Sequence, residues 1–444
     1  MQLRDNTRYK QAELDGIPNV VKSVADKTLL QLEREGLLVF PPVVSHSNGL
    51  TEDQMILQHV NSEYRTSNVM GFLGHGQERL TIASRFSSGA KDFFFEYLLA
   101  QIFDFPSVVA LDSDVGRDRQ LLQIVQFMFP QYLKSAMRKG LFKAYVNRQY
   151  NDLTVKGVID IARHIQVNTP FIGKIASNQR EFSFDNQLME LVRHTIELLK
   201  QMRYGEMILQ PVSAEVRAVI NATPGYQSAS RRKVIEVNEK QPVRHAYYAE
   251  YQALQRLCLF ILKNRKQALG GSTQHVRGIL FDGAWLWEEY VNQLIHGAFF
   301  HPMNKRKSGA QKLFSTLSGS KVGLIYPDFI SRCAHPRVIA DTKYKPCANI
   351  GNRDYLQLLA YMFRFDAKRG FYLYPEQDQQ EALVLQLNQG STYEQDVIGR
   401  EGVDVTKLGL RIPVVTPELG YDDFVSLMHV SEQSFVDRLL AATN

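Results

Sequence analysis

The stretch KVGLIYPDFISRCAHPRVIADTKYK, residues 321–345, decides how the rest of this sequence is interpreted. It reads as two apolar strands joined by a turn at residues 334–336. Asp328 follows a proline near the end of the first strand, and Asp341 and Lys343 lie in the second. Because side chains alternate along a strand, Asp341 and Lys343 point to the same face. The sequence therefore predicts that two carboxylates and one ammonium group converge.

Charged side chains in a strand as apolar as this one are costly to bury unless they are paired or bind a metal ion. Two carboxylates bind a hard divalent cation such as Mg²⁺ through oxygen, and the ion polarises a phosphate and lowers the pKa of a bound water. Lys343 can then orient the attacking water or offset charge in the transition state. We expect Asp328 and Asp341 to bind Mg²⁺, as one ion or two.

The flanks of the motif make it more specific than its short D-x-K spacing. Asp366 and Lys368 have the same spacing, but no Pro-Asp strand precedes them. Downstream of the motif, residues 352–365 read as a helix in which Gln357 and Tyr361, four positions apart, share a face. We expect these two side chains to support the charged cluster.

The helix expected over residues 281–295, upstream of the motif, carries two adjacent glutamates. Neighbouring residues on a helix point about 100° apart, so only one of them faces the strand carboxylates. Glu288 lies within the apolar stripe, three positions from both Trp285 and Val291, whereas Glu289 lies toward its edge. We expect Glu288 to be the third carboxylate of the catalytic and metal-binding set.

This order of elements resembles the core of the PD-(D/E)xK nucleases. The resemblance becomes closer to the McrC family, the nuclease subunit of McrBC modification-dependent restriction systems, and it covers roughly residues 140 to 440. The runs that carry it are VIADTKYK (338–345), DYLQLLAYM (354–362), GFYLYP (370–375), GVIDIARHI (157–165) and FSFDNQLMELVRHTIELL (182–199). The resemblance implies cleavage of double-stranded DNA carrying a 5-methylcytosine-type modification. It also implies a partner, an McrB-like AAA+ GTPase hexamer that recognises the modified DNA and is stimulated by this subunit.

The N-terminal region is the candidate for contact with that partner. In the longer McrC relatives a β-rich projection engages the GTPase, and residues 68–86, with a turn at Gly76, suit such a hairpin. Arg65, Asn68, Arg79 and Arg85 are the docking candidates, although for any one of them an ordinary solvated hairpin position is the simpler interpretation. No G-x-x-x-x-G-K-[ST] motif occurs, so we expect no nucleotide to be bound by this chain itself.

We expect a multidomain α/β fold with three parts. Residues 1–135 form an α+β partner-docking region with a β-hairpin projection, and residues 136–272 form a mostly helical middle domain. Residues 273–444 form the nuclease domain, with a mixed sheet flanked by helices. A basic loop over residues 301–320 precedes the Pro-Asp strand, and its Lys305, Arg306 and Lys307 are candidates for contact with the DNA backbone.

Composition narrows the class of protein. The net charge of +6 over 444 residues suits a nucleic-acid partner without requiring one. The three cysteines, Cys258, Cys333 and Cys347, form no C-x-x-C pair, which favours a reducing compartment. No run of eighteen apolar residues occurs and MQLRDNTRYK has no apolar signal core, so we expect a cytoplasmic protein without a membrane partner.

Other chemistries are poorly supported. No H-E-x-x-H motif occurs, and His296 and His301 are five apart, which does not place them on one helical face. Two alternatives in function remain open. One is a non-catalytic scaffold that activates a partner NTPase, which the complete set of charged core residues argues against. The other is a nuclease of the same superfamily that serves DNA repair.

Overall fold

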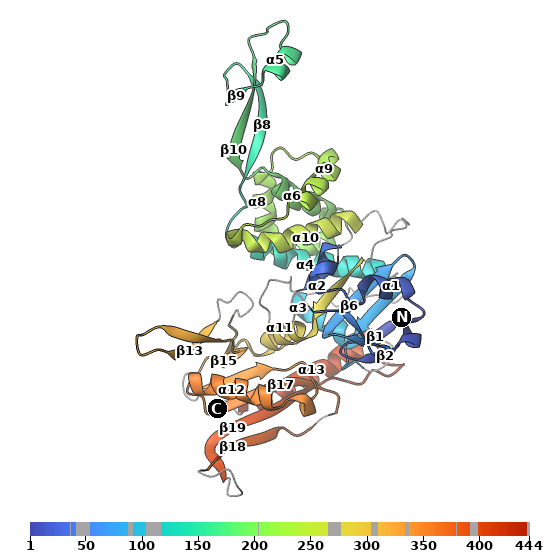
Figure 1. Ribbon diagram of the computed structural model, residues 1–444, viewed down its shortest axis with the longest axis vertical. Coiled ribbons are helices and arrows are strands. Elements are labelled where there is room, and N and C mark those ends of the chain that lie inside the picture. The colour runs from blue at the N-terminus through green and yellow to red at the C-terminus, as the bar shows by residue number, and fades with distance from the viewer. Residues whose placement is uncertain are drawn as a thin grey trace. The chain divides into compact units, whose positions relative to one another are not determined.

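The computed structural model describes residues 1–35, 37–40, 54–87, 92–103, 117–202, 204–264, 277–302, 310–333, 337–378, 380–390 and 398–441. The chain divides into two compact units (Figure 1). One unit combines Met1–Val115 with Ser272–Asn444, and the other is Gly116–Gly271. None of the helices in the described ranges is long and apolar enough to cross a membrane.

A five-stranded mixed sheet is the centre of the N-terminal part of the first unit. Its strands, in spatial order, are β1 (Gln2–Arg4), β7 (Glu78–Ala83), β6 (Val69–His75), β11 (Arg277–Asp282) and β3 (Leu38–Phe40). β11 runs antiparallel to β6 and parallel to β3. Its residues Ile279, Leu280 and Phe281 are fully buried, as expected for a strand covered on both faces. A strand from the C-terminal half thus completes the N-terminal sheet.

Helices cover the two faces of this sheet. On one face, Leu280 joins a core with η1 (Gln11–Leu14), α1 (Pro18–Val24) and α2 (Leu29–Arg34). On the other face, Phe281 packs against Phe95 of α3 (Phe93–Phe103), with 5.8 Å between ring centroids. A small sheet flanks these elements, with strands β2 (Arg8–Lys10), β5 (Glu63–Thr66) and β4 (Leu57–Val60).

The expected N-terminal projection is wrong. β6 and β7 do pair in antiparallel fashion, with a positive φ of 59° at Gly76 in the turn. However, they are inner strands of the sheet, and Val69 and Leu80 are buried. A Cβ at Gly71 would lie 2.1 Å from the carbonyl oxygen of Ile279, so the close approach of β11 requires glycine there. Strands with apolar residues on both faces are stable only when both faces are covered.

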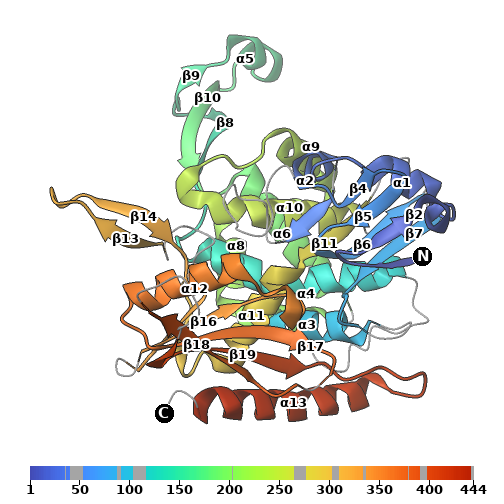
Figure 2. The same ribbon diagram turned by 60° about the horizontal axis from the view of Figure 1, so that its bottom comes forward.

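A second, six-stranded sheet lies in the C-terminal part of the same unit. Its strands, in spatial order, are β12 (Phe299–Phe300), β15 (Phe329–Ser331), β16 (Val338–Thr342), β17 (Arg369–Glu376), β19 (Ile398–Arg411) and β18 (Leu383–Gln389). β16, β17 and β19 are parallel, and the other pairs are antiparallel. The mixed sheet is flanked by helices α11 (Gly283–Ile295), α12 (Asn352–Arg364) and α13 (Tyr421–Ala441), with η7 (Cys347–Asn349) before α12. Figure 2 shows α12 and α13 on opposite faces of this sheet.

The first strand of the motif differs from the expectation of one continuous strand. Residues Lys321–Ile325 form β14, which pairs with β13 (Gln311–Ser315) in a separate hairpin, and β15 begins only at Phe329. Pro327 lies between them, and a proline lacks the N–H group that a continuous ladder needs. The turn expected at residues 334–336 lies outside the described residues.

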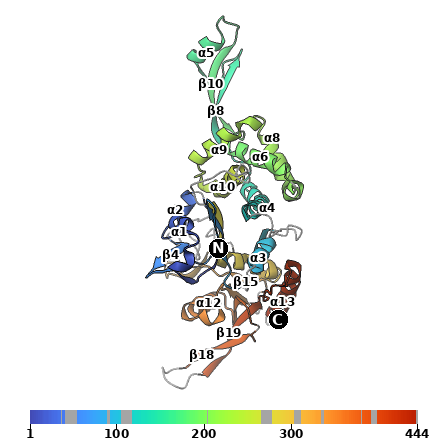
Figure 3. The same ribbon diagram turned by 90° about the vertical axis from the view of Figure 1, so that its right-hand side faces the viewer.

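The second unit, Gly116–Gly271, contains a group of helices and a long β-ribbon. The helices are α4 (Arg117–Met137), α6 (Gln187–Lys200), α7 (Gly205–Leu209), η2 (Gln210–Val212), α8 (Ser213–Ala222), η3 (Ser228–Ser230), α9 (Arg231–Lys240), η4 (Ala246–Tyr248) and α10 (Ala249–Asn264). The ribbon consists of β8 (Ala144–Asp152) and β10 (Ile175–Ser183), with β9 (Val158–Ile159) and α5 (Ile161–Val167) at its far end (Figure 3). The expectation of a mostly helical segment omitted this ribbon.

The expected boundaries at residues 135 and 272 do not separate three bodies. The described parts of residues 1–115 and 277–444 share one unit because β11 lies between β6 and β3. Aromatic packing between α3 and α13 joins the same two segments, with 5.8 Å between the ring centroids of Phe93 and Phe424. Long-range strand pairing, which has no signature in the sequence of either strand alone, decides this organisation.

Candidate active site

Two carboxylates meet where the β15–β16 ladder begins. Phe329 pairs with Ala340 in this antiparallel ladder, so the next residues outward are Asp328 and Asp341. One Asp328 carboxylate oxygen accepts hydrogen bonds of 2.8 Å from both the backbone N–H and the hydroxyl of Thr342. These bonds hold the Asp328 carboxylate against β16, beside Asp341.

Asp341 and Lys343 form a buried ion pair. The Lys343 ammonium contacts an Asp341 carboxylate oxygen, and the two side chains are 15% and 1% exposed. Burial and the nearby Asp328 charge raise the pKa of Asp341 to about 7, although Lys343 opposes the shift. Burial lowers the pKa of Lys343, but the charges of Asp341 and Asp328 outweigh it and raise that pKa. Lys343 is therefore a permanently charged group held among carboxylates.

Helix α12 supplies the two supporting side chains expected from the sequence. The Lys343 ammonium lies 3.5 Å from the Gln357 amide oxygen, to which it donates. The Gln357 amide nitrogen is 2.6 Å from the Tyr361 hydroxyl oxygen, so the two residues on one helical face contact each other. Burial raises the pKa of Tyr361 to about 12, so its hydroxyl stays protonated. Gln357 thus connects the ammonium group to the helix.

A second ion pair, which the sequence did not single out, lies beside the first. Lys345 donates to one Asp354 carboxylate oxygen at 2.7 Å, and the other Asp354 oxygen lies 3.9 Å from Lys343. Burial alone would raise the pKa of Asp354, but the Lys345 and Gly351 hydrogen bonds and the Lys343 charge lower it. The available signals were the alternation of Asp341, Lys343 and Lys345 along the strand and a spacing of three between Asp354 and Gln357.

The two glutamates of α11 lie in different surroundings. Glu288 lines the same pocket as Asp328 and Asp341, and its Oε1 is 3.5 Å from Nε2 of His301. Glu289 does not line this pocket; its Oε1 accepts a 2.9 Å hydrogen bond from the indole N–H of Trp285. His301 was considered in the sequence only as a zinc ligand, so its place at this site was missed.

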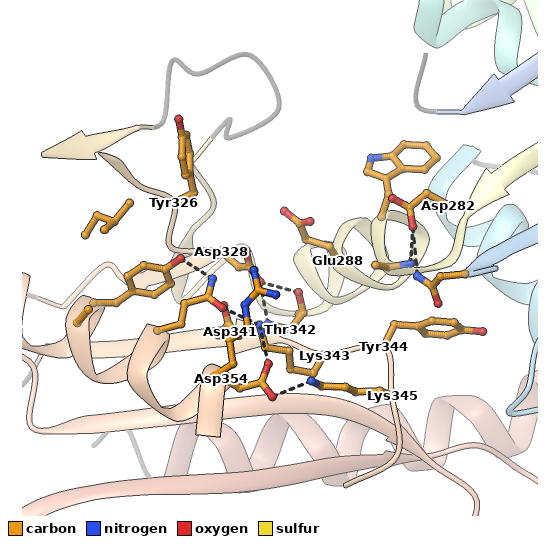
Figure 4. A pocket seen from close by; sticks show the side chains of 18 of the residues that line it. Asp282, Glu288, Tyr326, Asp328, Asp341, Thr342, Lys343, Tyr344, Lys345 and Asp354 are labelled. Atoms are coloured by element: carbon orange, nitrogen blue, oxygen red, sulfur yellow. Dashed lines mark hydrogen bonds and ion pairs between the residues drawn. The ribbon is translucent and has the colours of Figure 1, made fainter. Parts of the chain in front are cut away.

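These side chains line a pocket of about 800 Å³ in the first unit. Its walls come from α11, α12, the β14–β16 segment and Asn68, which precedes β6. Figure 4 shows Asp328, Asp341 and Lys343 grouped together, with Glu288 on the neighbouring helix. The pocket is large enough to admit part of a nucleic-acid backbone.

The donor set was tested against a bound Mg²⁺ ion. Asp328 and Asp341 supply the oxygen ligands that this hard cation prefers. Their mutual repulsion, which contributes to the raised pKa of Asp341, is the effect that a cation between them would relieve. Among the residues that the structure describes, no group of three or more His, Cys, Asp and Glu side chains is arranged to hold a metal ion. The pair fits the ion, and Glu288 faces the same pocket from α11.

The four expected docking residues are not gathered on one surface. Arg65 lies on β5 and donates to Asn6, and Arg79 donates to the Gly76 carbonyl oxygen within the β6–β7 turn. Arg85 is partly buried, contacts Asn68 and pairs with the Asp5 carboxylate at 2.6 Å. Two of the four therefore belong to the interior network of the first unit. Lys305, Arg306 and Lys307 lie outside the described residues.

Arg85 also connects the N-terminal sheet to the catalytic strand. Its guanidinium lies 4.9 Å from the ring centroid of Tyr344, which directly follows Lys343. The Tyr344 hydroxyl is 2.6 Å from the Ser84 hydroxyl, and burial raises the pKa of Tyr344. The end of the catalytic strand is therefore anchored to the sheet that β11 completes.

Comparison with known proteins gives one family and several structures. The family model described as McrBC 5-methylcytosine restriction system component matches residues 64–375, more than half of the chain. One similar structure is a refined half-complex from a tetradecameric assembly of Thermococcus gammatolerans McrB AAA+ hexamers with bound McrC. It is 15% identical, covers 97% of this chain and 99% of that chain, and has a TM-score of 0.45. Another is the cryo-EM structure of the Thermococcus gammatolerans McrBC complex, 13% identical over 67% of this chain and 87% of that chain, with a TM-score of 0.29. No curated protein matches the chain.

Proposed function

The chain belongs to the family of McrBC 5-methylcytosine restriction system components, and we propose that it is the nuclease subunit of such a system. In this role it hydrolyses phosphodiester bonds of modified double-stranded DNA in the cytoplasm, with Mg²⁺ as cofactor. The observation that carries the proposal is the convergence of Asp328, Asp341 and Lys343 in one pocket, with Gln357 on the ammonium group.

Each residue has a separate part in the proposed reaction. Asp328 and Asp341, with Glu288 from α11, would hold the Mg²⁺ ion, which polarises a phosphate and lowers the pKa of a bound water when present. Lys343, kept charged by Asp341 and oriented by Gln357, positions the attacking water and offsets negative charge on the phosphate oxygens. The buried position of the ion pair strengthens this electrostatic contribution, because less water screens it.

The basic segment before β13 is proposed to contact DNA. Lys305, Arg306 and Lys307 lie between β12 and β13 in the sequence, and Leu324 and Tyr326, which follow in β14 and directly after it, line the pocket. Lysine and arginine neutralise phosphates without reading base sequence. We therefore expect their replacement to weaken DNA binding for modified and unmodified DNA alike.

GTP hydrolysis is assigned to a partner. The sequence has no phosphate loop, and the family membership supports an McrB-like AAA+ GTPase hexamer as the partner. The best docking surface is the far end of the β8–β10 ribbon. There the apolar residues Leu153, Val158, Ile161 and Phe171 are between 66% and 77% exposed. A concentration of exposed apolar side chains marks an interaction surface.

The experiment compares Asp341→Asn with the wild type in cleavage of 5-methylcytosine-containing plasmid DNA, with the partner GTPase, GTP and Mg²⁺. We expect the variant to lose cleavage and to retain partner assembly. Asp366→Asn is the matched control, because Asp366 belongs to the exposed second D-x-K sequence after α12. Full cleavage by Asp341→Asn would refute the catalytic assignment and favour a scaffold role.

A further inference from the structure

We propose that His301 is a positioning residue that holds the Glu288 carboxylate in place at the metal-binding pocket. The proposal rests on the proposed nuclease function, because Glu288 matters in this way only if the pocket binds a divalent cation. Its starting point is that one imidazole ring contacts both α11 and the segment that enters β15. These two elements carry Glu288 and Asp328.

The Nδ1 side of the ring is fixed by the backbone. Nδ1 of His301 lies 2.8 Å from the carbonyl oxygen of Asp328. A carbonyl oxygen only accepts hydrogen bonds, so Nδ1 carries a proton and donates it. The ring is thereby tied to the residue whose side chain hydrogen-bonds to Thr342 on β16.

The Nε2 side of the ring faces the glutamate. Nε2 lies 3.5 Å from Oε1 of Glu288, and the two side chains are only 11% and 17% exposed. Groups that contact a metal-binding carboxylate from outside fix its orientation, and their loss commonly lowers metal affinity about 10–100-fold. A long glutamate side chain has several rotamers, so a contact that selects one of them reduces the entropy lost when a cation binds.

Packing keeps the ring in this orientation. The His301 ring is stacked on Phe329, with 4.9 Å between centroids and an interplanar angle of 28°. His301 directly follows β12, which pairs with β15, so the backbone places it opposite Phe329. The imidazole therefore bridges the two ligand-bearing elements.

Two substitutions separate the two ends of the ring. In His301→Asn the amide nitrogen stands near the Nδ1 position and can keep the bond to Asp328, but nothing remains at Nε2. In His301→Gln the amide nitrogen reaches the Nε2 position and can still contact Glu288. His296→Asn is the control, because His296 is exposed and its Nδ1 also contacts a backbone carbonyl oxygen, that of Gln293 at 2.9 Å.

The measurement is Mn²⁺ and Mg²⁺ binding to the full chain by isothermal titration calorimetry without DNA, with thermal melting of the metal-free proteins. We expect His301→Asn to bind at least about tenfold more weakly, His301→Gln to recover most of the affinity, and His296→Asn to match the wild type. Wild-type affinity in His301→Asn would overturn the proposal. So would equal losses in both His301 variants with a lower melting temperature, which indicate a packing role.

The two proposals fail in different ways. If the wild type binds no divalent cation, the nuclease function and the His301 role are both overturned. If the wild type binds the cation and Asp341→Asn abolishes that binding while His301→Asn does not, only the His301 role is overturned.

Discussion

Replacing Lys343 with methionine would leave Asp341 as a buried carboxylate without its counter-ion. Asp341 is only 1% exposed, and removing one partner of a buried ion pair costs about 3–5 kcal/mol. A carboxylate in this position relieves part of that cost by taking up a proton. Burial and Asp328 already raise the pKa of Asp341 to about 7, and Lys343 is the principal group that opposes them. In Lys343→Met we therefore expect this pKa to lie above 7.

The sign of the effect on metal binding follows from proton competition. A cation must displace the proton from Asp341, so its apparent affinity falls about tenfold for each unit by which the pKa exceeds the pH. At pH 7.5 we expect Mn²⁺ affinity to fall at least about tenfold in Lys343→Met, and to recover at pH 9, where Asp341 ionises. Cleavage should fall by about 100-fold or more at both pH values, because the missing ammonium group is not restored.

Stability provides an independent measurement of the same reasoning. The folded-state pKa of Asp341 is raised above the unfolded value of 3.8, so folding takes up a proton between about pH 4 and pH 7. The stability contribution of this group therefore falls as the pH rises through that window. In Lys343→Met the window extends to higher pH, and urea unfolding without metal should show a loss of roughly 1–3 kcal/mol at pH 7.5 that grows toward pH 9.

Lys368→Met is the control, because Lys368 belongs to the exposed D-x-K sequence after α12. Calorimetry at pH 7.5 and pH 9 reports metal affinity, and gel-based plasmid cleavage with the partner present reports activity. Wild-type Mn²⁺ affinity for Lys343→Met at pH 7.5, or full cleavage at pH 9, would refute this account.

Three further predictions concern other parts of the chain. Glu288→Gln should weaken Mg²⁺-dependent cleavage much more than Glu289→Gln, by about tenfold or more, because only Glu288 lines the pocket; equal losses across a Mg²⁺ titration would contradict this. Glu432→Leu should lower the free energy of unfolding by roughly 2–6 kcal/mol, because Glu432 accepts 2.6 Å hydrogen bonds from two tyrosine hydroxyls; urea denaturation measures it, and a loss below about 0.5 kcal/mol would count against it. Replacing residues 153–174, the far end of the ribbon, with a short turn should reduce stimulation of the partner GTPase without unfolding the chain, whereas deletion of residues 68–86 should unfold the first unit; unchanged stimulation would relocate the docking surface.

Local sequence patterns determined the centre of the site. Period-two alternation placed Asp341 and Lys343 on one face of a strand, and they form an ion pair. The spacing of four between Gln357 and Tyr361 predicted a contact that the structure contains. These features follow from the geometry of one strand and one helix, which short segments specify by themselves.

Tertiary structure alone decided which segments meet. Asn68 hydrogen-bonds to Asp282, 214 residues away, because β11 inserts between β6 and β3. His301 reaches Glu288 only because β12 pairs with β15 next to α11. The expected hairpin projection was wrong for the same reason, since an apolar strand pattern indicates burial without naming the partner strand. The free energy of pairing depends on complementary surfaces from distant parts of the chain, and periodicity within either segment does not encode that match.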